Sequence, residues 1–104
     1  MFDTFRNLFG LSKTDYTQLI ADGAIIIDVR SNGEFATGHI EGSINIPVNK
    51  LADNLQKLID KSKPVITCCA SGMRSATAKS FLESNGYVNV YNGGAWHSLN
   101  QKIK

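Results

Sequence analysis

The 104-residue sequence is poor in cysteine, with only two, Cys68 and Cys69, which are adjacent. Two neighbouring cysteines form neither a disulfide framework nor the C-x-x-C pair of a thiol redox protein. Adjacent Cα atoms are about 3.8 Å apart, closer than in a relaxed disulfide, so we expect no bond between them. Together with the two histidines they also lack the spacing of a structural zinc site. We therefore expect free thiols, no metal and a cytoplasmic protein.

Long apolar runs and runs of like charge are also absent. No stretch is apolar over enough length to cross a bilayer, and residues 1–10 lack the apolar core of a signal peptide. Eleven basic and nine acidic side chains give a net charge of +2, and they are scattered along the chain. This pattern predicts neither a nucleic-acid partner nor a membrane partner.

The length and composition indicate one folded unit. A chain of 104 residues has room for a single hydrophobic core, and 42% hydrophobic with 19% charged residues is typical of a globular protein. We divide it into an N-terminal extension, residues 1–10, and a single domain, residues 11–104. Within the extension Phe2, Phe5, Leu8 and Phe9 recur at roughly helical spacing, and we expect them to pack on the domain.

Strand and helix signals alternate along the domain. A first helix is expected to be capped by Ser12 or Thr14 and to end at Gly23. The other expected helices are 35–37, 48–60, 74–84 and one from Gly94, and the expected strands are 24–29, 44–46, 64–68 and 88–91. The alternation predicts an α/β fold with a central parallel sheet flanked by helices on both faces.

Three local signals support these boundaries. Ser31 and Glu34 have the spacing of a capping box. In residues 48–60 the leucines and Ile59 recur at helical spacing and should face the core. Gly86 follows residues 74–84, as a helix C-cap does, and that helix should pack Ala76, Ala78, Phe81 and Leu82 inward.

The segment 63–78, K-P-V-I-T-C-C-A-S-G-M-R-S-A-T-A, is the most informative part of the chain. A β-branched run ends on the two cysteines, and a short glycine-containing loop then leads into a helix. Backbone N–H groups of residues 70–75, the helix dipole and the charge of Arg74 would all stabilise a thiolate. The alternative is a buried strand with two inert cysteines. Small residues, glycine and arginine directly after a strand cysteine favour a nucleophile.

The same residues resemble a known family. Residues 69–75, C-A-S-G-M-R-S, are similar to the active-site loop C-x-S-G-x-R-S of the rhodanese-like sulfurtransferases. Three further blocks follow the family's order: I-D-V-R with E-F at 27–35, G-H-I-E-G-S-I-N-I-P at 38–47, and N-G-G-A-W at 92–96. The resemblance spans residues 11–103. It implies a small rhodanese-like domain of the single-domain kind, with no cofactor.

The resemblance also implies an enzyme and its site. Cys69 would take sulfur from a donor such as thiosulfate, carry it as a persulfide and pass it to a thiol or to cyanide. The residues expected to bind the substrate are Ala70, Ser71, Gly72, Met73, Arg74 and Ser75. Arg30 follows a predicted strand, at the edge where parallel sheets bind ligands, and is a candidate second anion contact. The family gives Asp28 and Arg30 a mainly structural role, His39 a scaffold role, and Trp96 a packing role.

The cysteine doublet leaves two spacings open. Four residues separate Cys69 from Arg74, as in the sulfur-transferring rhodaneses, whereas five separate Cys68 from Arg74, as in C-x5-R phosphatases and arsenate reductases. The positions of Gly72 and Ser75 and the lack of a histidine before Cys68 favour Cys69. Cys68 is then a structural neighbour, or a thiol that resolves a persulfide on Cys69.

Two other functions stay open. Ala70 and Met73 are uncharged where relatives often carry charge, which weakens the case for avid thiosulfate binding. A persulfide relay between a sulfur-donor and a sulfur-acceptor protein is the first alternative. A binding or sensing module is the second, and the intact Cys69 loop argues against it.

Overall fold

The computed structural model describes residues 14–58 and 60–104. Four strands form one sheet in the order β2-β1-β3-β4: β1 (Ile25–Asp28), β2 (Ile44–Asn45), β3 (Val65–Cys69) and β4 (Val90–Ala95). All of its strand pairs are parallel. The predicted parallel α/β sheet is confirmed. The aromatic residues of the extension lie outside the described residues.

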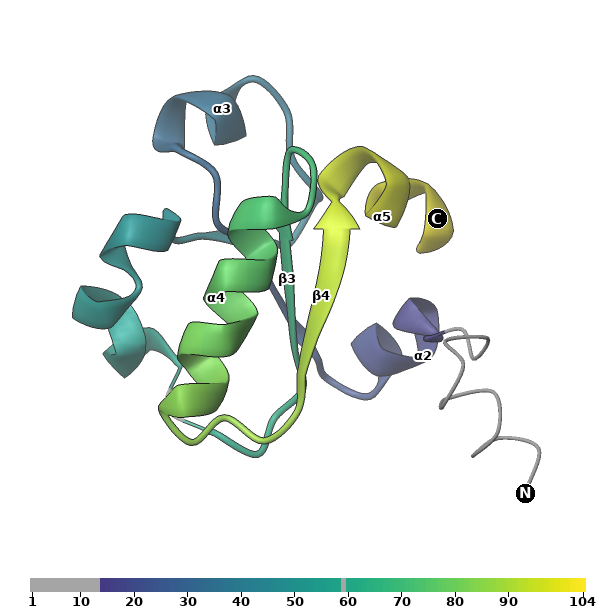
Figure 1. The fold of residues 1–104 in the computed structure, drawn as a ribbon. Helices are drawn as coiled ribbons and strands as arrows, with labels where there is room; N and C mark the ends of the chain where they lie inside the picture. Colours follow the sequence, from purple (N-terminus) through teal and green to yellow (C-terminus); the bar gives the residue numbers. More distant parts are fainter. Residues whose placement is uncertain (1–13, 59) are drawn as a thin grey trace.

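Helices cover both faces of the sheet, as expected (Figure 1). The elements on one face are α4 (Met73–Ser84) and the 3-10 helices η1 (Val48–Lys50) and η2 (Ala52–Lys57); those on the other are α2 (Tyr16–Ala21) and α5 (Trp96–Lys102). The short helix α3 (Asn32–Ala36) follows β1. Each face has its own apolar core, one around Ile27 and Leu82 and one around Ile66 and Leu99.

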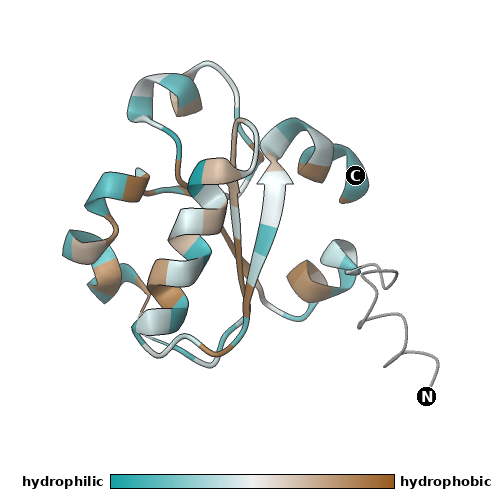
Figure 2. Ribbon diagram, viewed as in Figure 1, coloured by the Kyte–Doolittle hydropathy of each residue, from teal (hydrophilic) through white to brown (hydrophobic). Residues whose placement is uncertain are grey.

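Strand β3 lies at the centre and is buried throughout. Apolar colours run along this strand in Figure 2, whereas the helices carry both hydrophilic and hydrophobic residues. Side chains alternate along a strand, so Val65 and Cys69 pack toward α4, while Ile66 and Cys68 pack toward α5. The two adjacent cysteines therefore belong to opposite faces of the sheet.

The prediction of an α-helix over residues 48–60 is wrong. The side-chain amide of Asn54 donates to the Lys50 carbonyl at 2.8 Å, which is the acceptor that the Asn54 backbone N–H would use in an α-helix. That N–H bonds instead to the Leu51 carbonyl, giving 3-10 geometry. Leu51 and Leu58 are buried as expected, whereas Ile59 lies outside the described residues.

Capping and burial differ from the predictions at two positions. Helix α2 is capped by Asp15, whose carboxylate accepts from the Gln18 N–H at 3.0 Å, rather than by Thr14. The other expected cap, Ser12, lies outside the described residues. Ala76 of α4 is exposed, because the buried positions of that helix are Ser75, Ala78 and Leu82.

The ends of two strands also differ from the predicted ones. Strand β3 continues to Cys69, and β4 starts at Val90 and runs through the glycine pair to Ala95, so α5 begins only at Trp96. The predicted Ser31–Glu34 capping box is present. Gly86 has the positive φ, +92°, of a helix C-cap position.

Two further findings concern residues 14–58 and 60–104. None of their helices has the length and apolar character needed to cross a membrane. They also contain no group of three or more His, Cys, Asp or Glu side chains placed to hold a metal ion.

Candidate active site

The site is built where β3 ends and α4 begins. Cys69 is the last residue of β3, and Met73 is the first of α4, so the chain reverses within three residues. Gly72 makes this turn possible with a φ of +105°, a conformation that side chains other than glycine rarely adopt. A Cβ at Gly72 would also lie 3.4 Å from the Cα of Gly94. We call residues 70–75 the active-site loop.

The active-site loop surrounds the Cys69 sulfur with hydrogen-bond donors. The Gly72 N–H donates to Sγ at 2.9 Å and the Ser75 N–H at 3.4 Å. The thiol in turn lies 3.5 Å from the Ser75 hydroxyl and donates to it. Among the hydrogen bonds of the described residues, none joins Ala70, Met73 or Arg74 to Sγ. The predicted backbone site thus depends on its glycine and its last serine.

These contacts change the acidity of the thiol. Burial raises the pKa of Cys69, but its hydrogen bonds with the Ser75 hydroxyl and with the Ser75 and Gly72 N–H groups, together with the nearby Ser71 N–H, outweigh the effect of burial. The net pKa lies below the ordinary value of a thiol. Cys69 is 0% exposed, so a donor reaches the sulfur only when the groups that cover it move. The arrangement suits a nucleophilic thiolate held under a loop.

Cys68 has the opposite environment. It is 0% exposed on the other face of the sheet, and burial together with the charge of Asp28 raises its pKa to about 12. No hydrogen bond reaches its sulfur in the described part of the chain. The geometry therefore favours neither a C-x5-R site at Cys68 nor Cys68 as a thiol that resolves a Cys69 persulfide.

Arg74 is anchored by an acidic partner. Its guanidinium makes two parallel bonds to Glu34, Nη1 to Oε1 at 2.7 Å and Nη2 to Oε2 at 3.0 Å. Both side chains are 39% exposed. Hydrogen bonds from Arg74 are the main reason that the pKa of Glu34 falls to about 2. The cation belongs to the active-site loop, but its charge is balanced by a carboxylate from α3.

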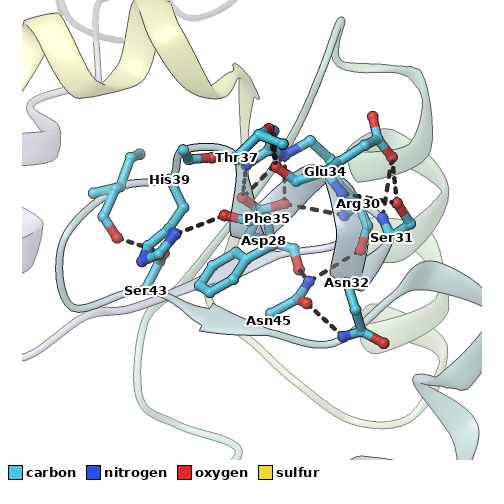
Figure 3. A network of polar contacts seen from close by, with 12 residues as sticks. Asp28, Arg30, Ser31, Asn32, Glu34, Phe35, Thr37, His39, Ser43 and Asn45 are labelled. Carbon is cyan, nitrogen blue, oxygen red and sulfur yellow. Dashed lines mark hydrogen bonds and ion pairs between the residues drawn. The ribbon is translucent and has the colours of Figure 1, made fainter.

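The structure does not bring Arg30 to the active-site loop. Arg30 is 4% exposed, and its Nη2 lies 2.7 Å from Asp28 Oδ2 (Figure 3). The same nitrogen also donates to the Gly38 carbonyl at 2.7 Å. The guanidinium packs 4.6 Å from the centre of the Trp96 ring. Its donors hold the β1–α3 connection together, so the geometry does not support a substrate contact and favours the structural role.

His39 and Trp96 serve the scaffold. The His39 ring stacks on Phe35 at 3.7 Å, and its Nδ1 lies 2.8 Å from the Phe35 carbonyl (Figure 3). Trp96 packs against Arg30 and Gly38. Among the described residues no hydrogen bond joins either of them to Cys69, and this agrees with their expected roles.

A polar pocket of about 300 Å³ opens beside Arg74. Its lining comes from the β1–α3 connection, from η1 and from the first turn of α4: Val29, Ser31, Asn32, Pro47, Val48, Asn49, Lys50 and Arg74. Lys50 and Arg74 place two cationic side chains in its wall. The sequence analysis missed Lys50, because its position in η1 depends on the 3-10 geometry.

Asn92 is a second residue that the sequence analysis missed as part of the site. It was noted only within the family motif, yet its side chain contacts both Ser75 and Gly72. The available signal was a polar residue directly after an expected strand and before two glycines.

Comparison with known proteins identifies the family. The model of the Rhodanese-like domain matches residues 12–97. The chain belongs to the rhodanese-like domain family. This rhodanese-like domain is 37% identical over 118 aligned positions to the putative mitochondrial thiosulfate sulfurtransferase of Schizosaccharomyces pombe, covering 100% of this chain and 80% of that protein. The human single-domain sulfurtransferase TSTD1 has a similar structure, with a TM-score of 0.72 and 31% identity over 84% of this chain and 90% of that one.

Another relative has a different name. The tRNA uridine(34) hydroxylase of Buchnera aphidicola is 30% identical over 87 residues, which cover 78% of this chain but 28% of the hydroxylase. The chain spans 21% and 24% of two further hydroxylases. Sulfur transfer is the general activity that the sulfurtransferase relatives support for the rhodanese-like domain, and the hydroxylase activity belongs to much longer proteins.

Proposed function

We propose that this protein transfers sulfane sulfur from a small anionic donor such as thiosulfate to a thiol or to cyanide, through a persulfide on Cys69. The main observation behind this proposal is the hydrogen bond of 2.9 Å from the Gly72 N–H to Cys69 Sγ. Together with the Ser75 N–H, it stabilises negative charge on the nucleophile and afterwards on the persulfide.

The proposed reaction has two displacements. The Cys69 thiolate attacks the outer sulfur of thiosulfate, a new S–S bond forms, and sulfite leaves with the electron pair of the broken bond. An acceptor thiolate or cyanide then attacks the outer sulfur of the persulfide. Its S–S bond breaks, the acceptor keeps the sulfur, and Cys69 returns as a thiolate.

Positive charge beside the active-site loop supports an anionic donor. Lys50 and Arg74 both line the polar pocket. Glu34 balances the charge of Arg74, so Lys50 supplies the net positive charge there. Opposite charge near the nucleophile raises the local concentration of an anion, and this effect weakens with salt.

The alternative is a persulfide relay to or from a partner protein. Met73 favours it, because this apolar side chain of the active-site loop is 79% exposed. A relay predicts poor saturation with thiosulfate but fast transfer from a protein persulfide such as that of a cysteine desulfurase. Measuring both transfers with the same preparation decides between the two functions.

Intact-mass spectrometry after brief incubation with thiosulfate tests the Cys69 persulfide. We expect a gain of one sulfur, about 32 Da, in the wild type and in Cys68→Ser, and no gain in Cys69→Ser. An adduct on Cys68, or none with any sulfur donor, would contradict the proposal.

We also propose that the protein works in the cytoplasm. Its two cysteines are free, and a persulfide carrier depends on thiols that stay reduced.

A further inference from the structure

The Asn92 side chain lies between the two residues that bind the Cys69 sulfur. Its Oδ1 lies 2.6 Å from the Ser75 hydroxyl, which donates to it, and 2.9 Å from the Gly94 N–H. Its Nδ2 donates to the Gly72 carbonyl at 3.2 Å. One amide thus contacts both ends of the active-site loop's glycine turn.

The orientation of this amide is determined by its partners. Rotating it by half a turn would point Nδ2 at the Gly94 N–H and Oδ1 at the Gly72 carbonyl, which pairs donor with donor and acceptor with acceptor. Asn92 therefore supplies one acceptor and one donor at defined places. No other uncharged residue of this size offers both groups in a plane.

The packing of strand β4 against β3 fixes the position of Asn92. The register between β3 and β4 shifts after Asn92, from Thr67↔Asn92 to Cys69↔Ala95. Gly93 sits so close to β3 that a Cβ would lie 2.9 Å from the Thr67 carbonyl oxygen. The Tyr16 hydroxyl also donates to the Asn92 carbonyl at 3.2 Å. Figure 1 shows the end of β4 beside the loop between β3 and α4.

We propose that Asn92 is a positioning residue that holds the Gly72 peptide and the Ser75 hydroxyl in the geometry that binds the Cys69 sulfur. The inference rests on the proposed function of Cys69. Asn92 does not touch the sulfur. It acts through Gly72 and Ser75, which are the two residues with hydrogen bonds to Sγ.

The distances indicate in which direction the loss of Asn92 changes the stability of the Cys69 thiolate. Without Asn92 the Gly72 turn loses an anchor, and the Gly72 N–H is the closest donor to the sulfur, at 2.9 Å. The Ser75 hydroxyl is 3.5 Å from the sulfur, an ordinary length for a hydrogen bond to sulfur, and without Asn92 it would no longer be held at that distance. We expect the loss of both fixed positions, at Gly72 and at Ser75, to make the thiolate less stable. The ionisable groups in electrostatic range, Arg74 and the buried Cys68, are unchanged.

The test is the pH dependence of Cys69 alkylation by iodoacetamide in the full chain, read by peptide mass spectrometry. We expect Asn92→Ala to raise the midpoint by about one pH unit, a factor of ten in thiolate at lower pH. Asn92→Asp should raise it further, because its carboxylate adds negative charge and cannot donate to the Gly72 carbonyl. Asn89→Ala is the matched control, since among residues 14–58 and 60–104 the Asn89 side chain bonds to the Ser62 carbonyl alone.

Each outcome decides the proposal. A wild-type midpoint in folded Asn92→Ala and Asn92→Asp, even with a lower melting temperature, would overturn it, and so would a lowered midpoint in Asn92→Ala. If Asn92→Ala does not fold, the nearly isosteric Asn92→Asp decides alone. Alkylation uses no sulfur donor. A raised midpoint without a thiosulfate adduct would therefore support the positioning role of Asn92 and contradict thiosulfate as the donor.

Discussion

At the residue scale, two adjacent cysteines acquire opposite chemistry from the alternation of side chains along β3. Cys69 faces α4, where N–H groups lower the pKa of its thiol. Cys68 faces the α5 side, where burial raises its pKa to about 12. The same alternation on β1 puts Asp28 beside Cys68, since these residues are paired in the sheet. Arg30, two residues after Asp28, is held by the Asp28 carboxylate and therefore does not reach the active-site loop.

Glu34 is the residue that limits the charge of Arg74. In Glu34→Gln the neutral side chain still suits the third position of a capping box, but it no longer balances the guanidinium. We expect the KM for thiosulfate to fall about threefold to tenfold, with a smaller change in kcat, and added salt to reduce the difference. Steady-state kinetics at two salt concentrations measure this. Glu83→Gln, exposed on α4, is the control. An unchanged or higher KM would show that Arg74 does not attract the donor.

At the element scale, the irregular parts of the fold build the site. The register shift between β3 and β4 brings Asn92 and Gly94 against the active-site loop. The 3-10 helix η1 brings Lys50 into the pocket wall. Neither irregularity is visible in the apolar periodicity, because periodicity reports which face is buried and not where a strand gains a residue.

Alanine substitutions at two glycines distinguish the effect of steric crowding on stability from the effect of helix propensity. At Gly93 a Cβ would lie 2.9 Å from Ile66, Leu99 and the Thr67 carbonyl oxygen, so Gly93→Ala should destabilise the protein by about 1–3 kcal/mol. At Gly33, in α3, nothing lies within 4 Å of the added Cβ. Gly33→Ala should therefore stabilise the protein by about 0.5–1 kcal/mol. Urea unfolding measures both, and similar values for the two would contradict the steric argument.

At the scale of the whole molecule, the site joins three segments at the carboxyl edge of the sheet. Parallel strands end at one edge, which is where such folds bind ligands. Here β3 supplies Cys69, α3 supplies Glu34, and β4 supplies Asn92. The Glu34–Arg74 pair links α3 to α4 across this edge.

This link makes part of the protein's stability dependent on pH. The pKa of Glu34 is about 2 in the folded chain and 4.5 ordinarily, so its contribution is present above pH 4.5 and is lost as the pH falls toward 2. We expect the melting temperature of the wild type to exceed that of Glu34→Gln at pH 7 and the difference to vanish near pH 2. Thermal melts across this range, with Glu83→Gln as control, measure it. A difference that is independent of pH would mean that the ion pair does not stabilise the fold.

The sequence by itself determined the fold class and the local pattern of the candidate site, a strand cysteine followed by a glycine turn. Alternating apolar segments specify a parallel α/β sheet, and the spacing of Cys69, Gly72 and Ser75 is local, so it is already present in the chain. Only the tertiary structure decided the roles of Asn92, Glu34, Lys50 and Arg30. Their partners lie far away in the sequence, and contact between distant residues depends on strand register and on the backbone geometry of η1, which a one-dimensional pattern does not contain.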